Sequence, residues 1–112
     1  MKIEGEGKLL RIFIGEADRF DGKPLYQYIV HRAREGGLAG ATVIRGLMGF
    51  GAHSRMHTAK LLRLSEDLPI IIELVDTEEK IKNFVKSIDG CIEEGMITME
   101  KAEIISYRSK KD

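Results

Sequence analysis

The sequence predicts an α+β fold in which two helices cover one face of a four-stranded sheet of antiparallel type. The predicted elements follow the order β-α-β-β-α-β, which is that of the ferredoxin-like sandwich. Each helical segment carries a single apolar stripe, and the strand segments are rich in β-branched residues. Two helices can cover only one face of such a sheet, so its second face is left for other contacts.

The first half of the chain supplies a strand, a helix and a second strand. Residues 9–14 are rich in β-branched and aromatic side chains, which predicts a strand. Pro24 suits the first turn of a helix, because the N–H that proline lacks would be unpaired there anyway. The glycine pair 36–37 would end that helix, and residues 41–45 predict the second strand.

The second half repeats this order. Residues 69–75 form a β-branched run with proline at a tolerated first position, which predicts the third strand. Asp76 would then cap the second helix, and Glu79, three residues on, would complete a capping box. Gly95 would end that helix, and residues 102–107 predict the last strand.

Alternation in the first and third strands gives one wholly apolar face and one mixed face. The mixed face holds Leu9, Arg11, Phe13, Ile71, Glu73 and Val75. It is too apolar to remain in water as a large patch, which favours burial against identical subunits. We expect the two strands to be parallel neighbours at the sheet centre, so Arg11 and Glu73 should pair with each other or with a residue of another subunit.

Composition excludes several classes of partner. Eighteen basic and eighteen acidic residues cancel, which argues against nucleic acid and against an anionic membrane. No apolar run approaches the ~18 residues of a membrane span, so no membrane insertion is expected. The single cysteine suits a reducing cytoplasm. The length is that of one domain, residues 1–112, in which 1–7 would be a flexible N-terminus and 109–112 a tail.

The connection between the second and third strands, residues 52–67, is long enough to be a functional loop. It contains His53 and His57, whose i, i+4 spacing would place both on one side of a helix, as in some metal sites. No cysteine or carboxylate stands nearby at ligand spacing, so the leading interpretation expects no metal. A metal-binding trimer that resembles the copper-tolerance proteins and uses both histidines is the alternative.

Six of the twelve glycines fall within residues 36–51, on both sides of the second strand. They are either a hairpin entry that needs positive φ angles or a nest of backbone N–H groups for an anion. Three short motifs stand in and after this region: Gly40-Ala41-Thr42-Val43, Gly49-Phe50-Gly51, and Leu68-Pro69 leading into residues 70–76. With these motifs, the element order and the long connection, residues 9–108 resemble the PII signalling proteins, and more closely the uncharacterised PII-like proteins.

The resemblance implies a homotrimer of ferredoxin-like subunits, with an adenine nucleotide (AMP, ADP or ATP) bound in the clefts between them. It also implies a regulator that signals through residues 52–67 to an unidentified protein, such as a membrane transporter or an enzyme. The residues that match the family's nucleotide-binding positions are Gly40, Thr42, Gly49, Phe50, Gly51 and Arg108.

The chain departs from the PII pattern in two places. The glycine-rich, lysine-bearing loop after the second helix is barely kept in residues 94–101. Of the two arginines at the end of the last strand, Ser106 replaces one and Arg108 matches the other. Both departures weaken the grip on phosphates, so the resemblance leaves open which nucleotide binds.

Catalysis is not expected. An acylphosphatase-like hydrolase would have the same topology, but that family carries its glycine loop after the first strand, whereas the glycines here follow the second. No Ser-His-Asp, Cys-His or paired-carboxylate arrangement can be recognised in the sequence.

Overall fold

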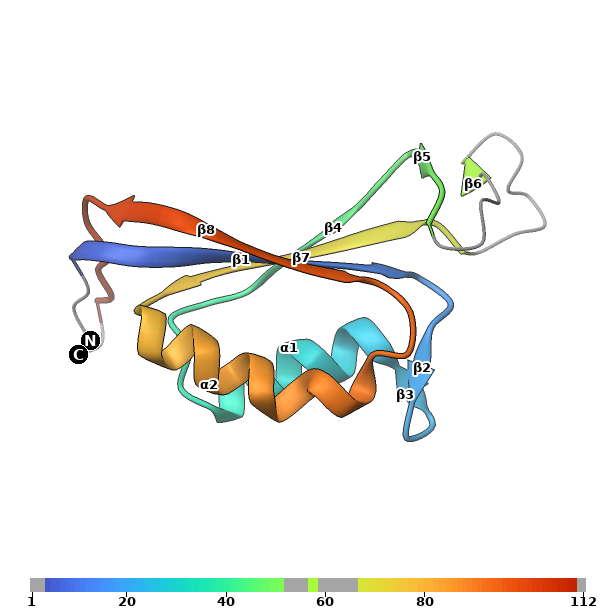
Figure 1. Ribbon diagram of the computed structural model, residues 1–112, viewed down its shortest axis with the longest axis horizontal. Coiled ribbons are helices and arrows are strands. Elements are labelled where there is room, and N and C mark those ends of the chain that lie inside the picture. Colours follow the sequence, from blue (N-terminus) through green and yellow to red (C-terminus); the bar gives the residue numbers. More distant parts are fainter. Residues whose placement is uncertain (1–3, 52–56, 59–66, 111–112) are drawn as a thin grey trace.

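The computed structural model describes residues 4–51, 57–58 and 67–110. Its main sheet has four strands in the order β4-β7-β1-β8, and both helices lie on one side of it (Figure 1). The α+β sandwich predicted from the sequence is confirmed. The main elements are β1 (Gly5–Gly15), α1 (Leu25–Glu35), β4 (Thr42–Arg45), β7 (Pro69–Asp76), α2 (Glu78–Ile88) and β8 (Met96–Ile104). The shorter elements are β2 (Arg19–Phe20), β3 (Lys23–Pro24), β5 (Met48–Gly49), β6 (His57–Thr58) and the 3-10 helix η1 (Asp89–Cys91).

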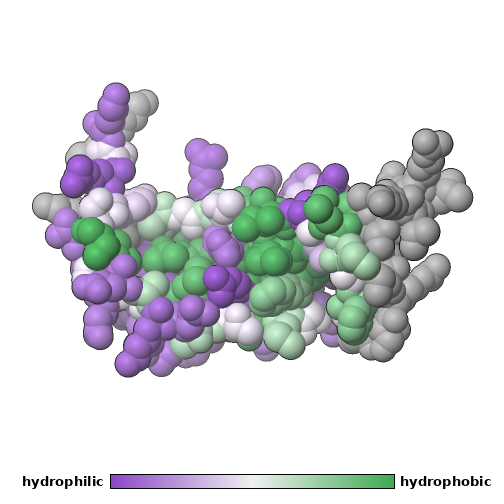
Figure 2. All heavy atoms as spheres, turned by 90° about the horizontal axis from the view of Figure 1, so that it is seen from above, coloured by the Kyte–Doolittle hydropathy of each residue, from purple (hydrophilic) through white to green (hydrophobic). Residues whose placement is uncertain are grey.

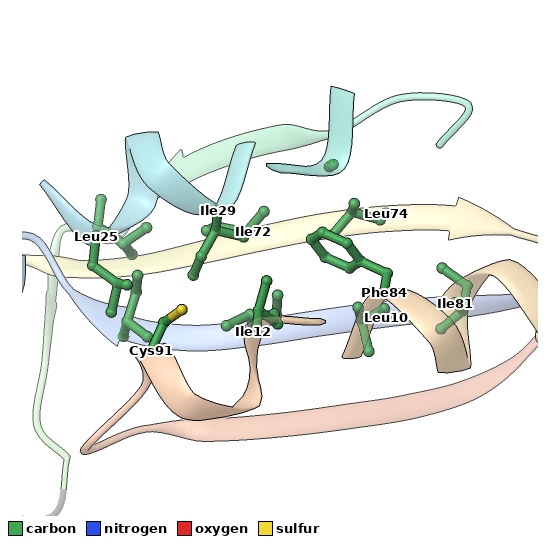
Figure 3. Packing of buried hydrophobic residues seen from close by; sticks show 13 residues of the cluster. Leu10, Ile12, Leu25, Ile29, Ile72, Leu74, Ile81, Phe84 and Cys91 are labelled. Carbon is green, nitrogen blue, oxygen red and sulfur yellow. The ribbon is translucent and has the colours of Figure 1, made fainter. Parts of the chain in front are cut away.

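The hydrophobic core lies between the sheet and the helices. Ile12 of β1 and Ile72 of β7 are directly paired, and both are 0% exposed. Side chains of the two central strands point towards those of both helices (Figure 3). Full burial of each such side chain contributes about 1.5–3 kcal/mol. The other core residues include Leu10, Leu74, Leu25, Ile29, Ile81, Phe84 and Cys91.

The two central strands, β1 and β7, are antiparallel, and the expectation that they are parallel was wrong. The reason is topological. β4 runs parallel to β1, but β7 lies between them and pairs antiparallel with both. In addition, β1 begins at Gly5 rather than at residue 9. Residues 5–7, expected in a flexible N-terminus, pair with residues 102–104 of β8.

The cap of α2 lies one residue later than predicted. Thr77 is the N-cap, and its side chain accepts a hydrogen bond from the backbone N–H of Lys80 at 3.4 Å. Asp76 instead ends β7 and is 0% exposed. Glu79 is therefore the second residue of the helix, and the capping box expected between Asp76 and Glu79 does not form.

The chain turns from α2 to β8 earlier than predicted. The helix ends at Ile88, whereas Gly95 has a φ of 149° and leads into β8 at Met96. A Cβ on Gly95 would lie 2.5 Å from the carbonyl oxygen of Phe13, so any residue other than glycine would be strained at this position. The last strand thus spans residues 96–104 rather than 102–107, and it pairs with β1 over its whole length. No helix in the described part of the chain is both long and apolar enough to cross a membrane.

Candidate functional site

The sheet face that the helices leave uncovered is largely apolar, and we call it the outer face. On this face Met96 is 61% exposed, and Ile44 and Val75 are also exposed. Figure 2 views the molecule from this side, with apolar areas interrupted near the middle by polar residues. The strand register places on it Leu9, Arg11, Phe13, Thr42, Ile44, Ile71, Glu73, Val75, Met96, Thr98 and Glu100.

Three charged side chains form a cluster in the middle of the outer face. Nε of Arg11 donates to Oε2 of Glu73 at 2.9 Å, and Nη1 donates to Oε2 of Glu100 at 3.0 Å. The predicted pairing of Arg11 with Glu73 is confirmed. The hydrogen bond with Glu73 is the main cause that raises the pKa of Arg11 above its ordinary value. A guanidinium held by two carboxylates keeps these charges satisfied on an apolar surface.

A pocket of about 330 Å³ opens where the outer face meets the glycine turn before β4. We call it the edge pocket. Its chemistry combines aliphatic side chains, two hydroxyl-bearing side chains besides a tyrosine, exposed backbone and one carboxylate. It is lined by Leu9, Ala39, Gly40, Ala41, Thr42, Glu73, Val75, Ile104, Ser106 and Tyr107. Such a lining suits a largely uncharged group with several hydrogen-bonding atoms.

Two of the predicted site residues, Gly40 and Thr42, line the edge pocket. Gly40 has nothing within 4 Å of the place where a Cβ would stand, and its φ is not in the left-handed region. Its lack of a side chain therefore leaves open space at the pocket and is not required by local packing. Arg108 is exposed and follows Tyr107, so it lies on the segment that forms one wall.

The other predicted residues lie elsewhere in the same chain. Gly49 ends β5, the short strand that follows β4 at its far end (Figure 1), and it packs against Pro69 at the start of β7. Phe50 and Gly51 come directly after it in the chain. A Cβ on Gly49 would lie 2.9 Å from Cγ of Pro69, so packing against that proline requires a glycine. Phe50 is 66% exposed. One chain thus does not bring the Gly40 and Gly49 groups together.

The glycine turn is held by side chains that sequence reasoning did not assign to the site. The Asp76 carboxylate accepts from the backbone N–H of Ala39 at 2.9 Å and from that of Thr77 at 2.7 Å. Tyr107 donates its hydroxyl to the carbonyl oxygen of Ala39 at 2.7 Å. A signal for Asp76 was present, since it continues the buried alternation of Ile70, Ile72 and Leu74. None pointed to Tyr107.

The metal alternative uses His53 and His57 of the connection 52–67. His53 lies outside the described residues, and of His57 only the backbone, in β6, is described. Most of the predicted functional loop, residues 52–67, is likewise outside them. Among the described residues there is no group of three or more His, Cys, Asp or Glu side chains placed to hold a metal ion.

The family model of DUF190, an uncharacterised conserved family, matches residues 7–104. The chain belongs to the DUF190 family. A UPF0166 protein of Aquifex aeolicus is 47% identical over 98 residues, which are 88% of this chain and 92% of that protein. With the PII-like structural neighbours described next, this confirms the predicted similarity to an uncharacterised PII-like family.

Solved structures that share the DUF190 chain's fold include PII-like proteins and a divalent ion tolerance protein. CPII of Thiomonas intermedia, described as a nitrogen regulatory PII-like protein bound to ADP, AMP and bicarbonate, has a TM-score of 0.69 at 20% identity, with 88% of each chain covered. A putative PII-like signalling protein of Thermus thermophilus has a TM-score of 0.67 at 15% identity, covering 90% of this chain and 91% of that one. The divalent ion tolerance protein CutA1 of Ehrlichia chaffeensis has a TM-score of 0.58 at 11% identity, covering 95% and 88%. These likenesses establish a common fold.

Proposed function

We propose that this DUF190 protein is a non-enzymatic, PII-like regulator that binds an adenine nucleotide at the edge pocket. The observation that carries the proposal is that Gly40 and Thr42, which match nucleotide-binding positions of PII proteins, line one pocket at the rim of an uncovered sheet face. A similar fold in CPII, described as bound to ADP and AMP, supports the same ligand class.

The pocket's chemistry suits the nucleoside end of such a ligand. Leu9, Val75 and Ile104 offer apolar surface to a flat base, and Thr42 and Ser106 offer hydroxyls to base or sugar atoms. Glu73 is the single charged residue of this lining, and it is negative, so the phosphates of the ligand would point away from it.

The phosphates would be held by a second subunit. Gly49, Phe50 and Gly51 lie at the far end of β4 in one chain, so they can serve the same ligand only if another copy presents them. We propose a homotrimer, in which the outer faces are shielded from water and each edge pocket meets the Gly49-Phe50-Gly51 segment of a neighbour. Arg108, exposed beside the pocket, would add a charged donor.

Signalling would follow from the position of the bound nucleotide. The connection 52–67 continues directly from Gly51, so a ligand held by that glycine segment would change the order of the connection, which then docks on a partner protein. Such a regulator would act in the cytoplasm on a transporter or an enzyme.

Titration calorimetry with AMP, ADP, ATP and a cyclic nucleotide tests the proposal. We expect at least one to bind with a Kd on the order of micromolar, or about 8 kcal/mol. Gly40→Val should abolish the heat, because Gly40 lines the pocket and a Cβ there meets no other atom of the fold within 4 Å. Gly90→Val is the matched control, since a Cβ on Gly90 also meets nothing within 4 Å but Gly90 lies in η1. The proposal falls if the unaltered protein gives no heat at millimolar nucleotide, or if both variants bind equally.

A further inference from the structure

The backbone before β4 is held at two nearby residues by three different parts of the chain. Lys80 of α2 donates its ammonium to the carbonyl oxygen of Gly37 at 3.1 Å. Asp76, at the end of β7, accepts a hydrogen bond from the N–H of Ala39. Tyr107, beyond β8, donates its hydroxyl to the carbonyl oxygen of Ala39. Gly37 has a φ of 75°, so the turn itself is made by glycine, whereas its exit into β4 is set by these side chains.

The two bonds to Ala39 differ in their surroundings. Asp76 is 0% exposed and is bonded to two backbone N–H groups, so its carboxylate is a fixed anchor for the N–H of Ala39. Tyr107 is half-buried, lines the edge pocket and lies outside regular secondary structure. Its hydroxyl links the segment after β8 to the glycine turn, and both bonded residues line the edge pocket.

From this arrangement we infer that Tyr107 and Asp76 are positioning residues: together they fix the peptide groups on both sides of Ala39 and thereby the shape of the edge pocket at Gly40 and Thr42. The inference rests on the proposed nucleotide site, because the pocket is the place where that ligand would bind. An unclamped turn would have to be ordered when the ligand binds, and this ordering costs affinity. By linkage, a ligand that favours the clamped turn also favours docking of the Tyr107 segment.

The first test compares Tyr107→Phe with the unaltered protein. Phenylalanine keeps the ring that lines the pocket and removes only the hydroxyl that bonds to Ala39. Tyr26→Phe is the matched control, because Tyr26 lies on α1 and does not line the edge pocket. We expect Tyr107→Phe to weaken ADP binding about three- to tenfold, the effect of one lost hydrogen bond, and Tyr26→Phe to leave it unchanged.

A second readout separates positioning from general loss of structure. In ligand-free protein, amide hydrogen exchange at residues 39–42 should be faster in Tyr107→Phe, while exchange in the centre of β1 stays as it was. Asp76→Asn, which retains one acceptor oxygen but cannot serve both N–H groups as a carboxylate does, should act in the same direction.

The outcomes distinguish this inference from the proposed function. If the unaltered protein binds ADP and Tyr107→Phe binds it equally, the positioning role is wrong and the nucleotide site stands. Equal exchange at residues 39–42 in both proteins also overturns the positioning role. If the unaltered protein binds none of the four nucleotides, the proposed function itself fails, and the inference fails with it.

Discussion

Arg11 and Glu73 lie directly opposite each other on the two central strands, with Nε of Arg11 2.9 Å from Oε2 of Glu73. In a single chain both side chains are about one-third exposed, at 35% and 33%. An ion pair with this exposure stabilises a protein only slightly, because water solvates both partners well. The same pair inside a subunit interface would be costly to break, since it would leave one charge buried alone.

The Arg11–Glu73 pair therefore reports on burial of the outer face. If the proposed homotrimer covers this face, Glu73→Gln should lower the thermal unfolding midpoint by more than an exposed pair can explain and should weaken assembly. Glu79→Gln, an exposed position on α2, serves as control. Calorimetric scans and light scattering at several protein concentrations give both quantities. Unchanged midpoint and unchanged mass for Glu73→Gln would mean that the Arg11–Glu73 pair is not buried in a subunit interface.

The core between sheet and helices should respond strongly to truncation. Ile72→Ala shortens a side chain that is 0% exposed and lies opposite Ile12. We expect it to lower the free energy of unfolding by about 2–5 kcal/mol. Ile105→Ala, at a side chain that is 79% exposed, should change it by less than about 0.5 kcal/mol. Urea unfolding measures both, and similar values for the two variants would contradict the packing described.

A side chain at Gly95 should lower the stability of the protein. Its φ of 149° is strained for other residues, and a Cβ would press on the carbonyl oxygen of Phe13 at 2.5 Å. Gly95→Ala should therefore cost about 1–3 kcal/mol of stability. Gly90→Ala is the matched control, because a Cβ there meets open space. Equal urea midpoints for the two variants would contradict the strain expected from a side chain at residue 95.

Asp18 should give the protein a specific pH dependence. Partial burial is the main cause that raises its pKa above the ordinary value of 3.8, and the negative charges of Asp67, Glu94 and Glu93 add to it. A carboxyl group with a raised pKa in the folded state holds more protons there than in the unfolded chain. Stability therefore falls as the pH rises from 3.8 towards the raised value.

Asp18→Asn cannot ionise, and its side-chain oxygen can still accept from the N–H of Gly15. Its unfolding midpoint relative to the unaltered protein should increase as the pH rises through that window and then level off. Asp21→Asn is the control, since Asp21 is exposed and asparagine tolerates its φ of 55°. A midpoint difference for Asp18→Asn that does not vary with pH would contradict the assignment.

The sequence predicted the helices and strands well, and it predicted their pairing and direction less well. Alternation in β1 and β7 correctly predicted a covered and an uncovered face, since period two leaves few choices. Strand direction depends on which strand inserts between β1 and β4, and no local pattern encodes that. Asp76 was misassigned because an aspartate before a helix resembles a cap, although the buried alternation of β7 includes it.

The candidate site was predictable only in part, for a similar reason. Gly40 and Thr42 lie two residues apart on one turn and strand, so a local motif could place them in one pocket. Gly49, Phe50 and Gly51 are close in sequence to that pair but lie at the other end of β4, and a single chain does not join the two groups. Tyr107 reaches Ala39 from 68 residues away, a contact made by tertiary packing alone.

Native mass spectrometry with ADP tests the central proposal most directly, because one spectrum reports both assembly and ligand. We expect a trimer that carries up to one nucleotide per subunit, and we expect Gly40→Val to form the same trimer without nucleotide. A monomer at micromolar protein, or a trimer that stays free of nucleotide at millimolar ADP, AMP and ATP, would contradict it.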